Sequence, residues 1–110
     1  MTNPEPTLIV IMTTMPDLER ANGIAKILVE EELAACVQVM SSMTSTYIWK
    51  EEICQDTEHL LLIKTLQTNY DALATRLRSL HPYETPEIIA IPALAADRDY
   101  LSWAISKCSK

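Results

Sequence analysis

The sequence predicts an α+β domain with a split βαβ topology and one additional helix at its carboxyl end. Three observations predict this fold: apolar, β-branched runs typical of strands, segments with a helical apolar stripe between them, and a long central stretch with a two-residue period. Their order is strand, helix, strand, strand, helix, strand, helix. This order corresponds to a ferredoxin-like sandwich, in which helices pack on an antiparallel sheet.

The first strand is predicted over residues 7–13, which form a continuous apolar and β-branched run between polar residues. A strand of this composition is covered on both faces and is therefore central in its sheet. The first helix is predicted to begin at residues 14–17, with Thr14 in a weak capping box, and to end near Glu32. Gly23 inside this helix is interpreted as a close approach to the sheet.

A long hairpin is predicted from residue 35 onward, where the apolar pattern changes to a period of two. The second strand covers residues 35–49 with a bulge at Ser41-Ser42, residues 50–52 form the tip, and residues 53–65 return. Strands of about 13 residues reach roughly 40 Å, whereas a helix of about 16 residues spans about 24 Å. The hairpin therefore protrudes beyond the body of the domain.

This protruding hairpin carries apolar side chains and an unpaired strand edge, and a two-stranded ribbon is only marginally stable in water. We therefore expect a homo-oligomer in which neighbouring subunits cover the hairpins. The exposed apolar side chains near the tip are Tyr47, Ile48, Trp49 and Ile53.

The second half of the chain predicts a helix, a strand and a final helix. Residues 68–71 form a capping box that begins a helix with an apolar stripe through residues 70–80. The last strand is predicted over residues 88–91, and Asp97 is the N-cap of a helix over residues 98–107. On that helix Tyr100 and Trp103 lie three residues apart and share a face.

Length and composition indicate one soluble domain. A chain of 110 residues with 48% apolar residues supports a single modest core, so residues 7–110 are predicted to form one domain after a flexible N-terminus at residues 1–6. The net charge of -6 favours cations or basic partners and disfavours nucleic acid and anionic membranes. The sequence shows neither a signal peptide nor an apolar run near the roughly 20 residues of a membrane span, which predicts a cytoplasmic location.

The cysteines and glycines exclude several classes of site. The three cysteines Cys36, Cys54 and Cys108 are widely spaced and form no C-x-x-C, which argues against a disulfide framework and against a thiolate zinc site. The chain contains one glycine, Gly23, so it has no glycine-rich phosphate loop. No organic cofactor is therefore expected.

Residues 81–87 combine an imidazole, a phenol and two carboxylates between two prolines. Each proline disfavours the helical conformation of the preceding residue, which predicts an extended, stiff segment. One interpretation is a proline-rich stop between a helix and a strand, and the other is a stop that also holds polar groups for binding. Side-chain alternation places four residues on one side and Glu84 on the other. These four are His81, Tyr83, Thr85 and Glu87.

Three segments together resemble the CutA family of divalent-cation tolerance proteins. They are Ala35-Cys36-Val37, residues 46–53 and the segment His-Pro-Tyr-Glu-Thr-Pro-Glu at residues 81–87, with Ile63-Lys64-Thr65 between them and Tyr100-Leu101-x-Trp103 after them. The resemblance implies a ferredoxin-like subunit, a homotrimer built through the long hairpin, and an architecture similar to the PII signalling proteins. It also implies a role in tolerance of copper and other divalent metals through binding or signalling, not catalysis.

The resemblance transfers only part of a metal site. Family members proposed to bind copper offer a cysteine near the end of the first strand and paired histidines before the Pro-Tyr motif, whereas this chain has Thr13 and Leu80-His81 there. One imidazole holds a divalent metal weakly, because such sites converge several donors. His81 with Glu84, or with a carboxylate of a neighbouring subunit, is the candidate weak site for copper or another divalent cation.

Three functions remain open from the residues. The first is a binding module whose clefts between subunits hold a metal ion or a small molecule, as in a PII-like sensor. The second is an enzyme with His81 and Glu84 as an acid-base pair and Lys64 as electrostatic partner, although no nucleophile lies in a recognisable signature. The third is a structural adaptor without a ligand of its own. The motif at residues 81–87 favours the binding module.

Aromatic rings with a few charged groups are typical of small-ligand clefts. The alternative is that the aromatic rings pack in a subunit interface and that Lys64 forms an ion pair with Glu58 or Glu84. The candidate cleft residues are Tyr47, Trp49, Glu58, Lys64, Tyr83 and Trp103.

Overall fold

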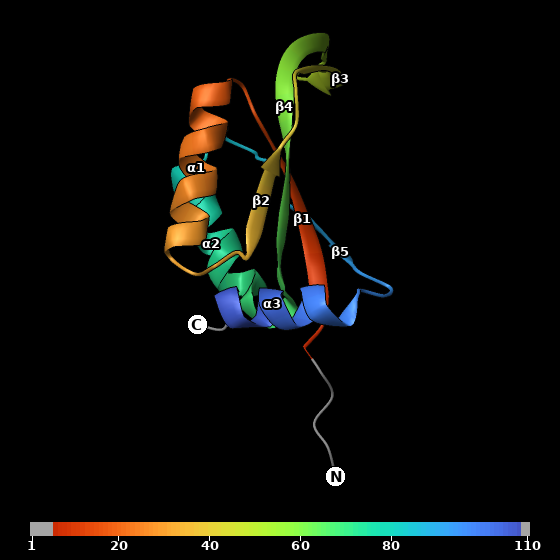
Figure 1. The fold of residues 1–110 in the computed structure, drawn as a ribbon. Helices are drawn as coiled ribbons and strands as arrows, with labels where there is room; N and C mark the ends of the chain where they lie inside the picture. The colour runs from red at the N-terminus through yellow and green to blue at the C-terminus, as the bar shows by residue number, and fades with distance from the viewer. Residues whose placement is uncertain (1–5, 109–110) are drawn as a thin grey trace.

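The computed structural model describes residues 6–108 (Figure 1). The predicted flexible N-terminus, except for Pro6, lies outside the described residues. In chain order the elements are β1 (Leu8–Met15), α1 (Leu18–Glu30), β2 (Cys36–Val39), β3 (Met43–Trp49), β4 (Glu52–Leu66), a 3-10 turn (Gln67–Asn69), α2 (Tyr70–Leu80), β5 (Ile89–Pro92) and α3 (Arg98–Cys108).

The strands form an antiparallel sheet in the order β2-β4-β1-β5, and β3 pairs with the outer half of β4. Helix α1 connects β1 to β2 across β4, and α2 connects β4 to β5 across β1, which is the split βαβ connection. Figure 1 shows α1 and α2 together on one face of the sheet and α3 across its lower end. The predicted α+β, ferredoxin-like fold with an extra C-terminal helix is confirmed.

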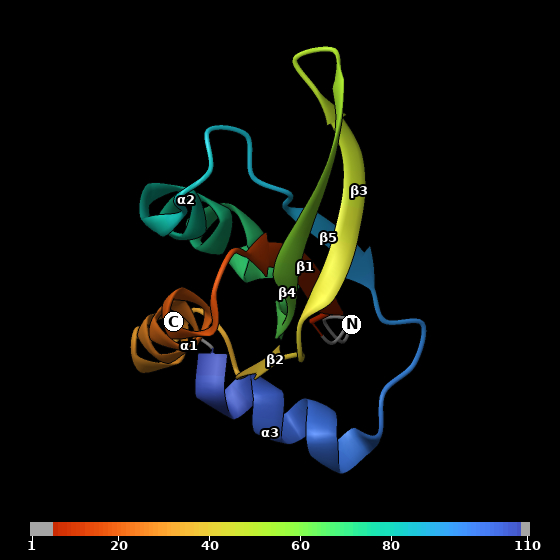
Figure 2. The ribbon, with the colours of Figure 1, turned by 90° about the horizontal axis from the view of Figure 1, so that it is seen from above.

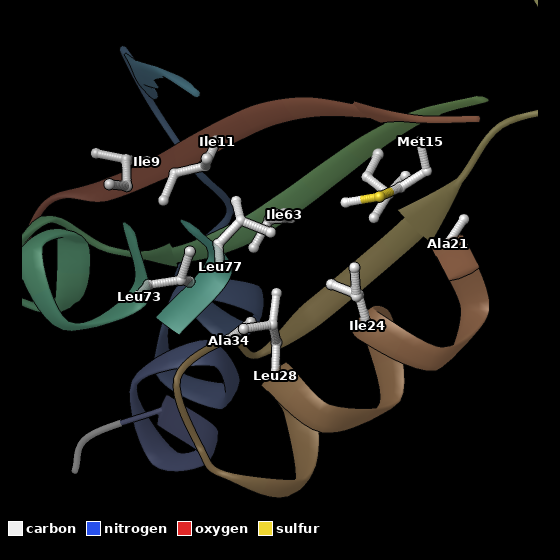
Figure 3. Packing of buried hydrophobic residues seen from close by; sticks show 11 residues of the cluster. Ile9, Ile11, Met15, Ala21, Ile24, Leu28, Ala34, Ile63, Leu73 and Leu77 are labelled. Atoms are coloured by element: carbon white, nitrogen blue, oxygen red, sulfur yellow. The ribbon is translucent and has the colours of Figure 1, made fainter. Parts of the chain in front are cut away.

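The main core lies between the sheet and the helices α1 and α2. Side chains of a strand alternate between faces, so Ile9 and Ile11 of β1 lie beside Ile63 of β4 on the helical side (Figure 3). Leu28 of α1 and Leu77 of α2 meet them and are fully buried. Burying each such side chain contributes about 1.5–3 kcal/mol of stability, so this layer is a main source of the stability of the fold.

Among residues 6–108, only one end of the opposite sheet face is covered. There α3 packs Ala104 and Cys108 against Leu8 and Leu66. Farther along, Ile89 and Ile91 of β5 remain 48% and 46% exposed. The single chain thus leaves apolar surface on the sheet face that points away from α1 and α2.

The beginning of α1 differs from the prediction. Thr14 does not begin the helix, because β1 continues to Met15 and Thr14 pairs with Leu60 of β4. The N-cap is Asp17, whose Oδ1 accepts the backbone N–H of Arg20 at 2.8 Å. Pairing in the sheet therefore overrides the local capping signal of Thr14.

The interpretation of Gly23 as a close approach to the sheet is wrong. Gly23 is exposed, and a Cβ atom built at this position would have nothing within 4 Å. The buried face of α1 instead carries Ala21, Ile24 and Leu28. Gly23 lies on the solvent side of the helix.

The predicted capping box at the beginning of α2 is also wrong. A 3-10 turn precedes α2, and the side chain of Asn69 makes no capping hydrogen bond. Asn69 is buried, and its amide donates to the backbone carbonyl of Cys108 at the end of α3. Thr68, the predicted cap of this box, instead lies within the 3-10 turn, and α2 begins only at Tyr70.

The predicted hairpin is confirmed in position and reach. β2 and β3 are separated at residues 40–42, where the bulge was expected, and both pair with β4. Lys50 and Glu51 form the tip with positive φ angles of 50° and 67°, which suit a two-residue hairpin turn. The molecule measures 54 × 25 × 23 Å, and Ile48 and Ile53 near the tip are 71% and 76% exposed.

Within residues 6–108, no helix combines the length and hydrophobicity needed to cross a membrane.

Candidate functional site

The segment at residues 81–87 begins where α2 ends. His81 has φ -73° and ψ 134°, the extended conformation that Pro82 predicts. The chain then bends at residues 82–85, so the prediction of an extended segment is wrong beyond His81. The bend is required because the chain must turn from α2 back toward β5, as the arched loop in Figure 2 shows.

His81 is held by hydrogen bonds from both sides. Its Nδ1 accepts the backbone N–H of Tyr83 at 3.2 Å, and its Nε2 lies 3.1 Å from Oγ1 of Thr13. Because Nδ1 accepts, the neutral ring carries its hydrogen on Nε2 and donates it to Thr13. Burial lowers the pKa of His81, against smaller raising effects of the Thr14 backbone and Glu58, so the neutral ring is favoured.

The rings of His81 and Tyr83 lie 4.9 Å apart between centroids, so these two residues share a side as predicted. The hydroxyl of Tyr83 donates to Oε2 of Glu58 at 2.7 Å. Burial raises the pKa of Tyr83, and the bond to Glu58 raises it further. The loop is therefore tied to β1 through His81 and to β4 through Tyr83.

Glu58 is the most buried carboxylate in the part of the chain that the structure describes, with 8% of its surface exposed. Only its Oε2 atom has a hydrogen bond within residues 6–108, the one from Tyr83. Burial raises the pKa of Glu87, and the charge of Glu58 adds to this effect. The Glu58 carboxylate thus lies close enough to disfavour the charged form of Glu87.

The hairpin contributes the second wall of the site. The hydroxyl of Tyr47 donates to the carboxylate of Asp56 across the two strands, and this bond is the main cause that raises the pKa of Tyr47 to about 12. Tyr47 and Trp49 lie two residues apart on β3, so their side chains are on the same face of the hairpin. Their pairing partners on β4 are Cys54 and Glu52. They are 42% and 41% exposed in the single chain.

A cavity of about 680 Å³ lies between this hairpin face and the loop of residues 82–87. Ser45, Tyr47 and Trp49 line it from β3, and Glu58 lines it from β4. The loop adds five lining residues, which are Pro82, Tyr83, Glu84, Thr85 and Glu87. Glu84 thus lines the same cavity as Tyr83, although strict alternation placed it on the opposite side.

The structure brings together most of the predicted site residues. Four of the six predicted cleft residues line the cavity, together with Glu84 of the predicted metal pair, while His81 lies directly behind Tyr83. These four are Tyr47, Trp49, Glu58 and Tyr83.

Lys64 and Trp103 do not line this cavity in the single chain. The ammonium group of Lys64 donates to Oε1 of Gln38. Within residues 6–108, the expected ion pair of Lys64 with Glu58 or Glu84 is not formed. The ring of Trp103 lies 5.6 Å from that of Tyr100 on α3. Both residues therefore belong to other parts of the surface.

The structure adds polar residues beyond the predicted site residues. Asp56 binds Tyr47 and Thr13 binds His81, and the cavity is also lined by Thr14, Ser45, Thr46, Thr85 and Glu87. The two-residue period of β4 places Asp56 beside Glu58 on one face, so the strand pattern contains the signal for Asp56. The contact of Thr13 with His81 joins distant segments and has no local signal.

Metal binding at His81 and Glu84 stays a prediction. Within the described residues, no group of three or more His, Cys, Asp and Glu side chains is arranged to hold a metal ion. Both ring nitrogens of His81 have partners within the chain. A divalent metal at this position would need one of these bonds to break and would need donors from another subunit.

The chain is similar over almost its whole length to one protein family. A family profile described as CutA1 divalent ion tolerance protein matches residues 9–107. The Divalent-cation tolerance protein CutA of Thermus thermophilus is 47% identical over 94 residues, which cover 86% of this chain and 91% of the relative. The protein of the same name from Citrobacter koseri is 38% identical over 98 residues, which cover 89% and 85% of the two chains.

Solved structures agree with these matches. A divalent cation tolerance protein (Cut A1) from Thermus thermophilus superposes with a TM-score of 0.88 at 44% identity and covers 91% of this chain and 97% of its own. CutA1 from Shewanella sp. SIB1 gives a TM-score of 0.91 at 39% identity, with 97% and 100% covered. A structure from Archaeoglobus fulgidus described as a periplasmic divalent cation tolerance protein CutA gives 0.89 at 33% identity, with 92% and 98% covered.

Proposed function

The chain belongs to the CutA1 divalent ion tolerance family, and on this premise we propose that it acts in divalent-cation tolerance as a cytoplasmic homotrimer that binds a ligand and does not catalyse a reaction. The cavity beside residues 82–87 is the ligand site of this proposal. The observation that carries it is the bond of Tyr83 to the buried Glu58, which fixes a polar loop against the hairpin.

The side-chain arrangement supports binding over catalysis. The acid-base hypothesis needs His81, Glu84 and Lys64 near one another, but Lys64 bonds to Gln38 and does not line the cavity. His81 is engaged with Thr13 and the backbone of Tyr83. The groups near the cavity are therefore held in fixed positions, as ligand binding requires.

The trimer is supported by the apolar surface that the single chain leaves exposed. Ile48 and Ile53 on the hairpin are 71% and 76% exposed, and Ile89 on the sheet is 48% exposed. Exposed apolar patches of this kind mark interaction sites. The number of three subunits follows from the family resemblance.

Copper or another divalent cation is the proposed metal, held weakly at His81 and Glu84 with a carboxylate of a neighbouring subunit. The cytoplasmic location is supported by the three cysteines, all of which are free thiols. Fractionation of cells that express the tagged protein tests the location, because a periplasmic fraction would contradict it.

Calorimetric titration of the purified protein with copper and then with zinc tests the metal site. Saturable binding is expected in the wild type and should be lost in His81→Ala. His59→Ala, at the chain's second histidine, is the matched control and should bind as the wild type does. Equal binding by His81→Ala would show that the metal does not bind at His81. Absence of saturable binding with both metals would contradict metal binding altogether.

A further inference from the structure

We propose that the cavity between the hairpin and residues 82–87 binds an organic cation, a small molecule that carries an alkylammonium group. The inference rests on the proposed function, because it takes this cavity as the ligand site and adds the chemical class of the ligand. It combines four observations: the charge of the cavity walls, the state of Glu58, the aromatic rings, and the spacing of the carboxylates.

The charge of the cavity walls that this chain supplies favours a cationic over an anionic ligand. Three carboxylates line the cavity, those of Glu58, Glu84 and Glu87, and no Lys or Arg side chain does so within the described residues. Lys64, one of the predicted cleft residues, instead donates a hydrogen bond from its ammonium group to Gln38. A phosphate or a carboxylate entering this space would meet only like charge.

Glu58 supplies the second observation. Its side chain is more than nine-tenths removed from solvent, with 8% exposed, yet only one carboxylate oxygen has a hydrogen bond within residues 6–108. Because no buried side-chain oxygen within residues 6–108 lacks a hydrogen bond, this second oxygen is accessible to solvent and available to a donor from a ligand, while the charge of Glu58 repels that of Glu87. An ammonium group that donates to the free oxygen would satisfy Glu58 and neutralise this repulsion.

The aromatic rings of the cavity favour a cation on a carbon skeleton. Tyr47 and Trp49 line the cavity from the hairpin and Tyr83 lines it from the loop. A cation within about 6 Å of such a ring is attracted by its π-electrons, by up to about 2 kcal/mol in a desolvated site. Aliphatic groups of the same ligand would cover the exposed ring faces.

The spacing of the carboxylates favours an organic cation over a metal ion. Within the described residues, no three acidic, cysteine or histidine side chains converge closely enough to hold a metal ion. The volume of about 680 Å³ is far larger than an ion needs. It lies in the range of roughly 300–1,000 Å³ that is typical of sites for small organic ligands.

The test uses the full-length oligomer, titrated by calorimetry with tetramethylammonium and with putrescine at constant ionic strength. Saturable binding of at least one probe is expected, with a change in tryptophan fluorescence because Trp49 lines the cavity. Glu58→Gln is expected to weaken binding about tenfold, which corresponds to about 1.4 kcal/mol. Glu84→Gln, at an exposed residue whose change is compatible with folding, should weaken binding by a smaller factor.

The matched control is Glu30→Gln, which removes the same charge from the solvent side of α1 and should leave binding unchanged. Absence of saturable binding by both probes, or equal binding by Glu58→Gln and Glu84→Gln and the wild type, would overturn the inference. Binding of ATP or citrate that depends on Glu58 would overturn it as well.

The failure of this inference is distinguishable from that of the proposed function. If copper binding depends on His81 but neither ammonium probe binds, only the organic ligand is wrong. If ammonium binding depends on Glu58 while copper is silent, the inference stands and the metal site of the proposed function is wrong.

Discussion

The hydrogen bond between Tyr83 and Glu58 is the contact that joins the loop after α2 to the base of the hairpin. Glu58 has 8% of its surface exposed, so water cannot fully replace the phenol if the bond is lost. A buried acceptor without a partner costs about 1–3 kcal/mol of stability. This single bond therefore bears on both the cavity and the stability of the fold.

Tyr83→Phe is expected to lower the free energy of unfolding by about 1–3 kcal/mol, because it removes the donor and leaves the Glu58 carboxylate without a hydrogen bond. Denaturant titration measures the change. Tyr70→Phe is the control, since the Tyr70 hydroxyl has no hydrogen bond in the part of the chain that the structure describes, and it should stay within about 0.5 kcal/mol. Equal effects of both variants would show that the bond to Glu58 contributes nothing.

His81 predicts a pH dependence of stability. Burial lowers its pKa from 6.5, so above about pH 6.5 the ring is neutral in both states and its contribution is complete. As the pH falls, the unfolded chain binds the proton first and stability declines until the pH passes the folded pKa. Between about pH 7 and pH 5 in the presence of EDTA, His81→Asn should show a smaller decline than the wild type. An unchanged decline would place its cause elsewhere.

At the scale of the elements, the strands were predictable, but of the helix starts only that of α3 was, where Asp97 accepts the backbone N–H groups of Asp99 and Tyr100 as its predicted N-cap. The apolar run of β1 and the two-residue period of the hairpin are strong signals, since sheet burial imposes them on every second residue. The capping signals at Thr14 and Thr68 are short; pairing with β4 overrides the first, and the second lies within the 3-10 turn that precedes α2. Contacts between distant segments decide such positions, and a local pattern cannot contain them.

Gly23→Ala tests the corrected position of this residue. Because Gly23 lies inside α1 with open space where a Cβ atom would go, alanine should add about 0.5–1 kcal/mol of stability through helix propensity. The denaturation midpoint is expected to rise while the slope of the transition stays constant. Destabilisation would mean that this face of α1 is covered in the assembled protein.

Trp49→Ala tests the hairpin as an interface. Trp49 is 41% exposed in the single chain, and its burial by a neighbouring subunit would make the truncation cost on the order of 3–5 kcal/mol of assembly. Analytical ultracentrifugation should show partial dissociation. Val29→Ala, at a 43% exposed position on α1, is the control and should sediment as the wild type does. An intact assembly in Trp49→Ala would contradict the placement of the hairpin in the interface.

The whole molecule is more than twice as long as it is wide, at 54 × 25 × 23 Å. This shape follows from β4, which has 15 residues, whereas α1 has 13 residues with a smaller rise per residue. A chain of this shape has a small hydrophobic core relative to its surface area, and apolar side chains stay exposed on the sheet face opposite α1 and α2. The missing burial is expected to come from other copies of the chain.

The melting temperature should therefore rise with protein concentration, because association stabilises the folded state by mass action. Calorimetric scans over a hundredfold range of concentration measure this dependence. A constant melting temperature together with a monomeric mass would contradict the oligomer.

The sequence predicted many of the residues of the candidate site, but it did not predict which of them the fold brings together. Residues 81–87 stand out because two prolines enclose several polar groups, and Tyr47 and Trp49 stand out as rare aromatic residues on a hairpin. Lys64 and Trp103 lie outside the cavity, because β4 and α3 direct these side chains toward Gln38 and Tyr100. The sequence contains suitable residue types for a ligand site, but only the three-dimensional structure shows which of these residues line the same cavity.

The continuity of β4 has a consequence for how this chain tolerates changes in length. One uninterrupted strand pairs with β1 and β2 in the body and with β3 in the hairpin, so side chains alternate in the same phase from Glu52 to Leu66. A single inserted or deleted residue at the junction near Glu58 would turn every side chain of one half to the opposite face. The number of residues in β4 is therefore more strongly constrained than their identities, and viable length variants should be confined to the tip at Lys50 and Glu51.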